Sequence, residues 1–209
     1  MLRASHHHLM SASPAPSEEA FDGCEDERVR RLDYPQLRRL PPLQKDMAYF
    51  YGDDWQSHVS PSLATRKYVS RVEYCARERP YLLVAHMYTR YLGDLFGGQM
   101  MSGMARNSLP LDPGCGTEFY NFEDVKDVKV RQRVVTPAWP DAAFIEQWYG
   151  ELNQLNLTDE QKQELVDEAN LVFALNIDLF DELEGNLLKT FWKLTSSALS
   201  TALGLKTTA

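Results

Sequence analysis

The sequence predicts an all-α fold built as one domain. Apolar residues recur at three- and four-residue steps in several segments, prolines and glycines separate those segments, and no run keeps the period of two that marks a β-strand. The chain has 209 residues, of which 44% are apolar and 25% are charged. This composition is ordinary for a globular protein that buries one core.

Composition also argues against several classes of protein. The formal net charge is -8, whereas nucleic-acid binders usually carry a basic patch or stripe, so no nucleic-acid partner is expected. The three cysteines are widely spaced and form no zinc-binding pattern, so they are interpreted as reduced thiols. No run approaches the roughly 20 apolar residues of a membrane-spanning helix, so no transmembrane span is expected.

The two ends of the chain differ from the middle. Residues 1–17 carry several serines and no acid, and are interpreted as a disordered leader or a short targeting segment. Within them, the triplet His6–His8 is typical of tracts that bind metal ions adventitiously. Residues 186–209 form a tail with the run LLKTFWKL, which either packs loosely or contacts a surface or membrane. The helical domain is therefore expected to span residues 18–185.

The first half of this domain is expected to contain two well-defined helices. Pro35, Pro41 and Pro42 should break the early charged segment, and a short helix from Leu43 to Tyr51, ending at Gly52, should follow. The stretch from Ser62 to Arg79 has apolar residues at helical spacing and a basic outer face. Its expected apolar face comprises Leu63, Tyr68, Val69, Val72 and Cys75.

A long helix from Tyr81 to about Leu109 is expected to be interrupted by glycines. Gly93, Gly97 and Gly98 each cost a helix roughly 0.5–1 kcal/mol relative to alanine, which is more than close packing usually needs. The spacing of Gly93 and Gly97 leaves a stripe without side chains on one helix face. Either a partner helix or a flat ligand could approach such a stripe.

Charged residues beside this stripe favour the flat ligand. Asp94 lies between the glycines, and a buried carboxylate is costly unless it is paired or hydrogen-bonded. Arg90 lies one turn earlier, at the spacing that allows an ion pair with Asp94. A glycine-lined slot beside an oriented acid suits a flat cofactor.

Two further helices are expected after an irregular region at residues 110–140, which is rich in proline and glycine. The first runs from about Asp141 to Asn153. The second begins at Thr158, which forms a capping-box pattern with Gln161. Its expected apolar face comprises Leu165, Ala169, Val172, Phe173, Ile177, Phe180 and Leu183, with Gly185 as its C-terminal cap.

Several segments resemble the heme oxygenase family. YTRYLGDLFGGQ is similar to the family's distal-helix signature, which usually has serine in place of Phe96. The segments DERVRRLDYPQLRRLPPL, DMAYFYG, LLVAHMYTRYLGD and FALNIDLFDEL also resemble family counterparts, in the same order. On these blocks the chain is identified as a member of the family from about Glu18 to Gly185.

The resemblance implies a single-domain helical bundle that holds heme between a proximal helix and a kinked, glycine-containing distal helix. Heme would be both cofactor and substrate, opened to biliverdin, carbon monoxide and iron. The reaction would use dioxygen as co-substrate and electrons from a reductase or ferredoxin. A location in the plastid or cytoplasm is expected.

The resemblance also implies roles for individual residues. Asp94 would hold a water molecule and deliver protons through it, as a general acid acting through solvent. Arg90 and Asn176 would belong to the same hydrogen-bond network. Cofactor contacts are expected from Tyr88, at a heme propionate, and from Gly93, Gly97, Gly98 and Phe173. His86 is interpreted as either a hydrogen-bonded core residue or a heme contact.

The chain also departs from the family pattern. The resemblance begins near Glu18, so the proximal helix with its iron-binding histidine is expected to be missing, and the metal ligand is left unknown. Ile145 and Tyr149 stand where the family has basic residues for the propionates, and Phe96 adds bulk near the oxygen site. Either the chain is a truncated enzyme, or it is a non-catalytic relative that binds a tetrapyrrole or a partner.

Of these two alternatives we favour the heme oxygenase enzyme. We expect this 209-residue chain to bind heme weakly and to turn it over slowly. A bundle without its proximal helix is also expected to expose apolar surface and to self-associate.

Overall fold

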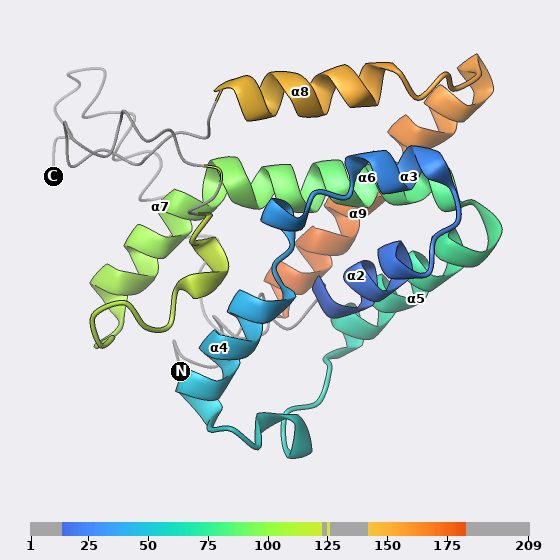
Figure 1. Ribbon diagram of the computed structural model, residues 1–209. Helices are drawn as coiled ribbons and strands as arrows, with labels where there is room; N and C mark the ends of the chain where they lie inside the picture. The colour runs from blue at the N-terminus through green and yellow to red at the C-terminus, as the bar shows by residue number, and fades with distance from the viewer. Residues whose placement is uncertain (1–13, 123–124, 126–141, 183–209) are drawn as a thin grey trace, which may run out of the picture.

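The computed structural model describes residues 14–122, 125 and 142–182, and all regular structure in these residues is helical (Figure 1). The α-helices are α2 (Pro14–Asp22), α3 (Glu27–Leu32), α4 (Leu40–Tyr51), α5 (Leu63–Glu78), α6 (Leu83–His86), α7 (Gly93–Ser108), α8 (Ala142–Asn153) and α9 (Asp159–Asp181). Short 3-10 turns lie at Pro35–Leu37, Trp55–Ser57, Pro80–Leu82 and Glu118–Tyr120. The predicted all-α class is confirmed.

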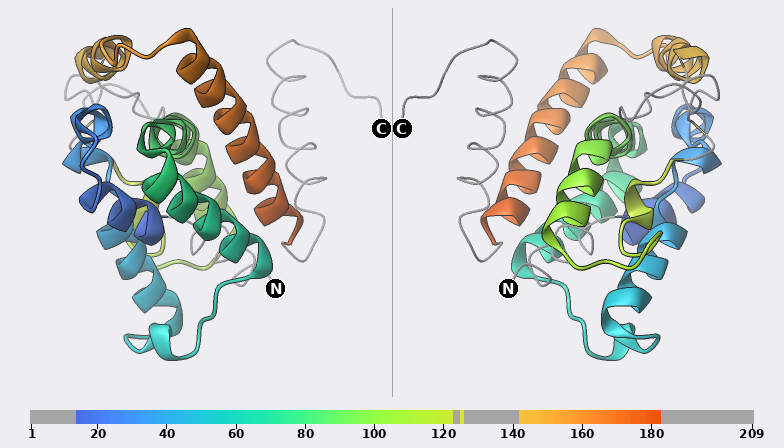
Figure 2. Two further views of the ribbon diagram at one scale, coloured as in Figure 1. Left: turned by 90° about the vertical axis from the view of Figure 1, so that its right-hand side faces the viewer. Right: turned by 90° about the vertical axis from the view of Figure 1, so that its left-hand side faces the viewer.

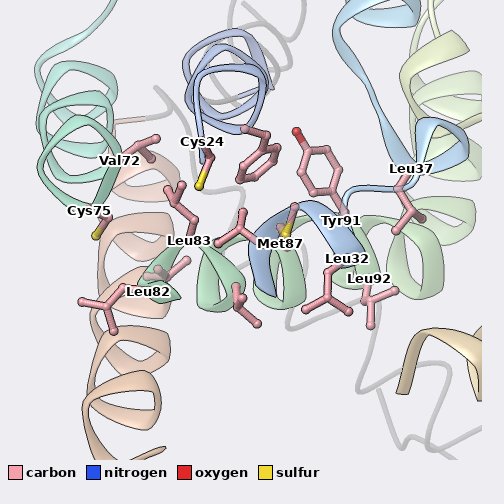
Figure 3. Close-up of a cluster of buried hydrophobic side chains, with 14 of the residues drawn as sticks. Cys24, Leu32, Leu37, Val72, Cys75, Leu82, Leu83, Met87, Tyr91 and Leu92 are labelled. Carbon is pink, nitrogen blue, oxygen red and sulfur yellow. The ribbon is translucent and has the colours of Figure 1, made fainter. Parts of the chain in front are cut away.

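One long helix runs through the middle of the bundle. It consists of α6, a π-helical turn at Met87–Leu92, and α7, and is called the central helix below. Side views show it between α9 on one side and α3 on the other (Figure 2). Leu83, Met87 and Tyr91, at four-residue spacing, point from it toward α2 and are buried in the main core (Figure 3).

The central helix differs in detail from its prediction. A 3-10 turn at Pro80–Leu82 precedes it, so the helix begins at Leu83 and not at Tyr81, and in place of the predicted interruption at the glycines it has a π-helical turn just before Gly93. The α-helix then continues through Gly93, Gly97 and Gly98 without a break. Figure 1 shows that the helix bends along its length. π-helical turns occur frequently at functional sites.

Several prolines lie at the beginnings of helices, whereas the sequence analysis expected them to interrupt the chain between helices. Helix α4 begins at Leu40, so Pro41 and Pro42 lie in its first turn, and the prediction that they break the chain was wrong. The first turn tolerates proline because its N–H groups have no partner within the helix. Helix α2 begins at Pro14, inside the segment interpreted as a leader.

The capping prediction for α9 is confirmed, whereas its predicted apolar face is buried only in part. Thr158 and Gln161 form a complete capping box. Phe173 and Ile177, however, are 55% and 57% exposed, and Phe180 is 37% exposed. The fully buried positions of α9 are Glu168, Val172 and Leu179, because these face α5 and α6. Leu63, on the predicted apolar face of α5, is likewise 58% exposed.

Some predictions concern other parts of the chain. Residues 1–13 of the expected leader, including His6–His8, lie outside the described residues, as do Leu183, Gly185 and the tail. Among the described helices, none is both long and apolar enough to cross a membrane.

Candidate active site

A pocket of about 280 Å³ lies between the central helix and α9. From the central helix it is lined by Thr89, Arg90, Gly93, Asp94, Gly97 and Gly98, together with Met100 and Met101. Phe173, Asn176 and Phe180 line it from α9, and Tyr120 closes a third side. The residues with predicted catalytic or cofactor-binding roles therefore lie around one pocket, apart from Tyr88, whereas Phe96 and His86 are not among its lining residues.

The three glycines have two different environments. A Cβ atom added at Gly93 or Gly97 would meet nothing within 4 Å, so the backbone at these positions faces open space. A Cβ at Gly98 would lie 2.7 Å from Cδ1 of Tyr120. Gly93 and Gly97 therefore leave room for a ligand, whereas Gly98 makes room for a neighbouring side chain.

Asp94 is held beside this open stripe by Arg90. Arg90 Nε lies 3.2 Å from Asp94 Oδ2, which confirms the predicted ion pair one helical turn apart. The guanidinium also donates through Nη1 to Asn176 Oδ1 at 3.2 Å, and Asn176 Nδ2 donates to the Val172 carbonyl oxygen at 2.8 Å. This chain of contacts joins the central helix to α9 across the back of the pocket.

The electrostatics favour proton transfer by Asp94. Burial raises the pKa of the Asp94 carboxyl, while the guanidinium groups of Arg90 and Arg39 oppose that rise. A carboxyl group with a raised pKa is more often protonated near neutral pH than an exposed one. Such a group can serve as a general acid, and perturbed carboxyls of this kind are common at functional sites.

Two polar residues of the pocket were missed by the sequence analysis. Within the described residues, the buried Thr89 Oγ1 has no hydrogen-bond partner, so it is available to a bound molecule. Burial also raises the pKa of Tyr120. Tyr120 belongs to a short 3-10 turn in the region predicted to be irregular, where no periodic pattern marks a residue as inward-facing.

The buried carboxylate of Asp46 holds the turn that contains Tyr120. The backbone N–H groups of Glu118 and Phe119 donate to Asp46 at 2.9 and 2.8 Å. Arg39 Nη1 donates to the carbonyl oxygen of Asn121 at 3.0 Å. Helix α4 and its N-terminal cap thus hold the loop that closes the pocket.

Tyr88 lies apart from the pocket, among residues of α8. The residue is 41% exposed, and the centroid of its ring lies 6.1 Å from that of Trp148 and 6.4 Å from that of Tyr149. Burial and a hydrogen bond with Tyr88 raise the pKa of Tyr149. A pair of phenols therefore occupies the region where the family resemblance implied basic side chains.

His86 is a buried core residue, as one of its two interpretations had it. His86 Nε2 lies 3.0 Å from Glu168 Oε1, and Nδ1 lies 3.4 Å from the Tyr68 hydroxyl. It does not line the pocket.

Comparison with known proteins agrees with the geometry of this site. A family model described as "Heme oxygenase" matches residues 15–182. The chain is 37% identical over 185 residues to a heme oxygenase of Pyropia yezoensis, covering 88% of this chain and 72% of that protein. It is 39% identical over 186 residues to heme oxygenase 1 of Synechocystis sp., covering 86% of this chain and 72% of that protein.

A solved structure is similar as well. The crystal structure of heme oxygenase-1 from Synechocystis sp. PCC6803 in complex with heme superposes with a TM-score of 0.76 at 35% identity, covering 94% of this chain and 85% of that one. The chain therefore belongs to the heme oxygenase family and has the enzymatic activity for which that family is named.

Proposed function

We propose that heme binds in the pocket against the backbone of Gly93 and Gly97 and is the substrate of this enzyme. The observation that carries the proposal is the open stripe beside the Arg90–Asp94 pair, because a flat apolar ring can lie against it within reach of an acid. The exposed rings of Phe173 and Phe180 supply apolar walls. The similar Synechocystis structure is a complex with heme, which supports the proposal.

When bound, heme supplies the iron at which dioxygen reacts and the ring that is opened. The pocket residues supply positioning and protons. Asp94 holds a proton at its carboxyl group and passes it through a water molecule, Arg90 orients that carboxyl, and Asn176 fixes the Arg90 guanidinium. The aromatic walls keep bulk water away from the reacting face.

The reaction requires electrons and dioxygen from outside the chain. We propose a reductase or a ferredoxin as the electron donor and biliverdin, carbon monoxide and iron as the products. The relatives come from organisms such as Pyropia yezoensis and Synechocystis sp., and a plastid or cytoplasmic location stays a prediction.

The test is a hemin titration of the full chain followed by reduction with ascorbate or ferredoxin. Asp94→Asn should bind hemin with unchanged affinity, because the substitution keeps the shape of the pocket. It should form biliverdin about 10²–10⁴ times more slowly, the range that general acid catalysis contributes. Asp53→Asn, a change at an exposed carboxylate, is the matched control and should leave both quantities unchanged.

Two results would contradict the proposal. One is the lack of saturable one-to-one hemin binding by the unmodified chain. The other is an Asp94→Asn variant that binds hemin and forms biliverdin at the original rate.

A further inference from the structure

Three residues of different metal-ligand types meet in the core, away from the pocket. Cys75 of α5, His86 of α6 and Glu168 of α9 are 0%, 1% and 2% exposed. None of them lines the pocket described above. Thiolate, imidazole and carboxylate are the groups with which proteins bind zinc.

The spacing of the three donor atoms matches the size of a metal ion. Glu168 Oε1 lies 3.0 Å from His86 Nε2 and 3.5 Å from Cys75 Sγ, and that sulfur lies 3.8 Å from His86 Nε2. The point equidistant from three atoms at these separations lies about 2.0 Å from each of them. Zinc binds nitrogen and oxygen at about 2.0–2.2 Å and sulfur at about 2.3 Å. An ion at this point requires little rearrangement of the side chains.

Neighbouring residues orient two of the three donors. The Tyr68 hydroxyl lies 3.4 Å from His86 Nδ1, so Nε2 is turned toward the other donors. Arg71 Nε donates to both oxygens of the Glu168 carboxylate, at 2.9 and 3.1 Å. Metal-binding histidines and carboxylates usually have hydrogen-bond partners of this kind, which fix their direction.

The surroundings of Glu168 and Cys75 also shift the pKa values of these two donors. Burial alone would raise the pKa of Glu168, but hydrogen bonds with His86 and Arg71 outweigh it and lower the pKa to about 2. Glu168 is therefore a carboxylate at neutral pH. Burial, together with the Glu168 charge, raises the pKa of Cys75 to about 12, so a bound ion must displace the thiol proton.

An ion bound in the cluster would enter past Glu168. A second pocket, of about 320 Å³, lies between α5 and α9 and is bordered by Arg71, Leu82, Glu168 and Leu171, among others. Glu168 thus belongs both to the buried cluster and to the wall of a pocket at the surface. An entry path is one of the features that a metal site requires.

We propose that Cys75, His86 and Glu168 bind one divalent cation of the zinc class, with a water molecule as fourth ligand. The ion links α5, α6 and α9. These helices carry or support the walls of the active-site pocket, so the ion stabilises the pocket without touching the substrate.

The experiment uses Co²⁺ as a spectroscopic substitute for Zn²⁺ in the full chain, without hemin. The expected result is a thiolate-to-cobalt charge-transfer band that saturates at one ion per chain and disappears when Zn²⁺ is added. Cys75→Val should abolish the band. The matched control is Cys24→Ala, at another buried thiol, which should leave the band unchanged.

A second measurement does not depend on a variant that folds. X-ray absorption of the zinc-loaded, unmodified chain should show one sulfur at about 2.3 Å among nitrogen and oxygen ligands. The His6–His8 tract cannot supply that sulfur, and replacing its histidines with alanine should leave the spectrum unchanged. A metal shell without sulfur, a charge-transfer band that persists in Cys75→Val, or no one-to-one binding would each overturn the proposal and leave a purely hydrogen-bonded cluster.

Discussion

Adjacent glycines of the central helix have opposite structural roles. Gly97 faces open space in the pocket, whereas Gly98 lies against the ring of Tyr120. The sequence alone cannot distinguish the roles of Gly97 and Gly98, because both are glycines of the same helix. They differ because Tyr120, from a turn later in the chain, packs against Gly98 and not against Gly97.

This difference predicts opposite effects of the same substitution. Gly97→Ala should stabilise the fold by about 0.5–1 kcal/mol, since alanine is the better helix former and the added methyl meets no protein atom. The same methyl lies where the heme ring is proposed to lie, so hemin affinity should fall about tenfold, equivalent to about 1.4 kcal/mol. Thermal unfolding and a hemin titration measure the two effects.

Gly98→Ala is the matched comparison. Its methyl group would overlap the Tyr120 ring, and overpacking of this kind costs about 1–3 kcal/mol. The melting temperature should therefore fall. Equal changes in stability for the two alanine variants would contradict the assignment of the glycine faces.

At the scale of whole helices, one buried carboxylate joins three of them. Glu18 of α2 accepts a hydrogen bond from the Leu40 backbone N–H at 3.0 Å, at the beginning of α4. The Tyr91 hydroxyl, from the central helix, donates to the same oxygen at 3.3 Å. Burial raises the pKa of Glu18, although its hydrogen bonds with the Arg39 and Leu40 backbone and the charge of Arg38 oppose the rise.

A pH dependence of stability follows from this raised pKa. When the folded pKa of an acid lies above its unfolded value, here 4.5, its contribution to stability is complete below that value. The contribution is lost as the pH rises through the folded pKa. Glu18→Gln removes this titration and keeps an oxygen acceptor, so the stability of the unmodified chain relative to Glu18→Gln should fall as the pH increases above 4.5.

Denaturant unfolding at several pH values, for both chains, measures this relative stability. Glu19→Gln is the control, because Glu19 is the exposed neighbour of Glu18 on the same helix. Its stability should follow that of the unmodified chain at each pH. Parallel curves for Glu18→Gln and the unmodified chain would contradict the prediction.

Considered as a whole, the molecule exposes apolar side chains on the two helices that line its pocket. In the part of the chain that the structure describes, Phe173 and Ile177 of α9 are more than half exposed, and Phe96 and Met100 of α7 are 43% and 49% exposed. Contiguous apolar surface on a monomer commonly marks a binding site or promotes association. The net charge of -8 opposes association at low ionic strength.

The heme-free protein should therefore self-associate, and more strongly at high salt, where the net charge is screened. Hemin should shift the equilibrium toward monomer because it covers part of the apolar surface. Sedimentation velocity over a range of protein and salt concentrations measures this. Ile177→Lys should weaken the association, whereas Leu63→Lys, a similarly exposed position on α5, should not. A monomer at all salt concentrations would show the prediction to be wrong.

The family assignment confirms the prediction of an enzyme over that of a non-catalytic relative. The impaired turnover that we expect of this 209-residue chain stays a prediction, as do the roles of the individual site residues. The hemin titration tests both.

Sequence patterns that span only a few residues were enough to predict most helices and the position of Asp94. The capping box at Thr158, the end of α4 at Gly52 and the Arg90–Asp94 pair depend on residues within a few positions of one another. Interactions of this range leave a readable pattern because a helix brings residues three and four apart together.

Long-range packing determined the rest. Helix α9 carries apolar residues on more than one face, and only its contacts with α5 and α6 select Val172 for the core and leave Phe173 at the pocket. Tyr120 reaches the pocket because Asp46, far away in sequence, holds the two residues before it. The meeting of Cys75, His86 and Glu168 likewise requires three helices. Spacing along the chain does not encode such contacts, because they depend on which helix faces meet in the folded bundle.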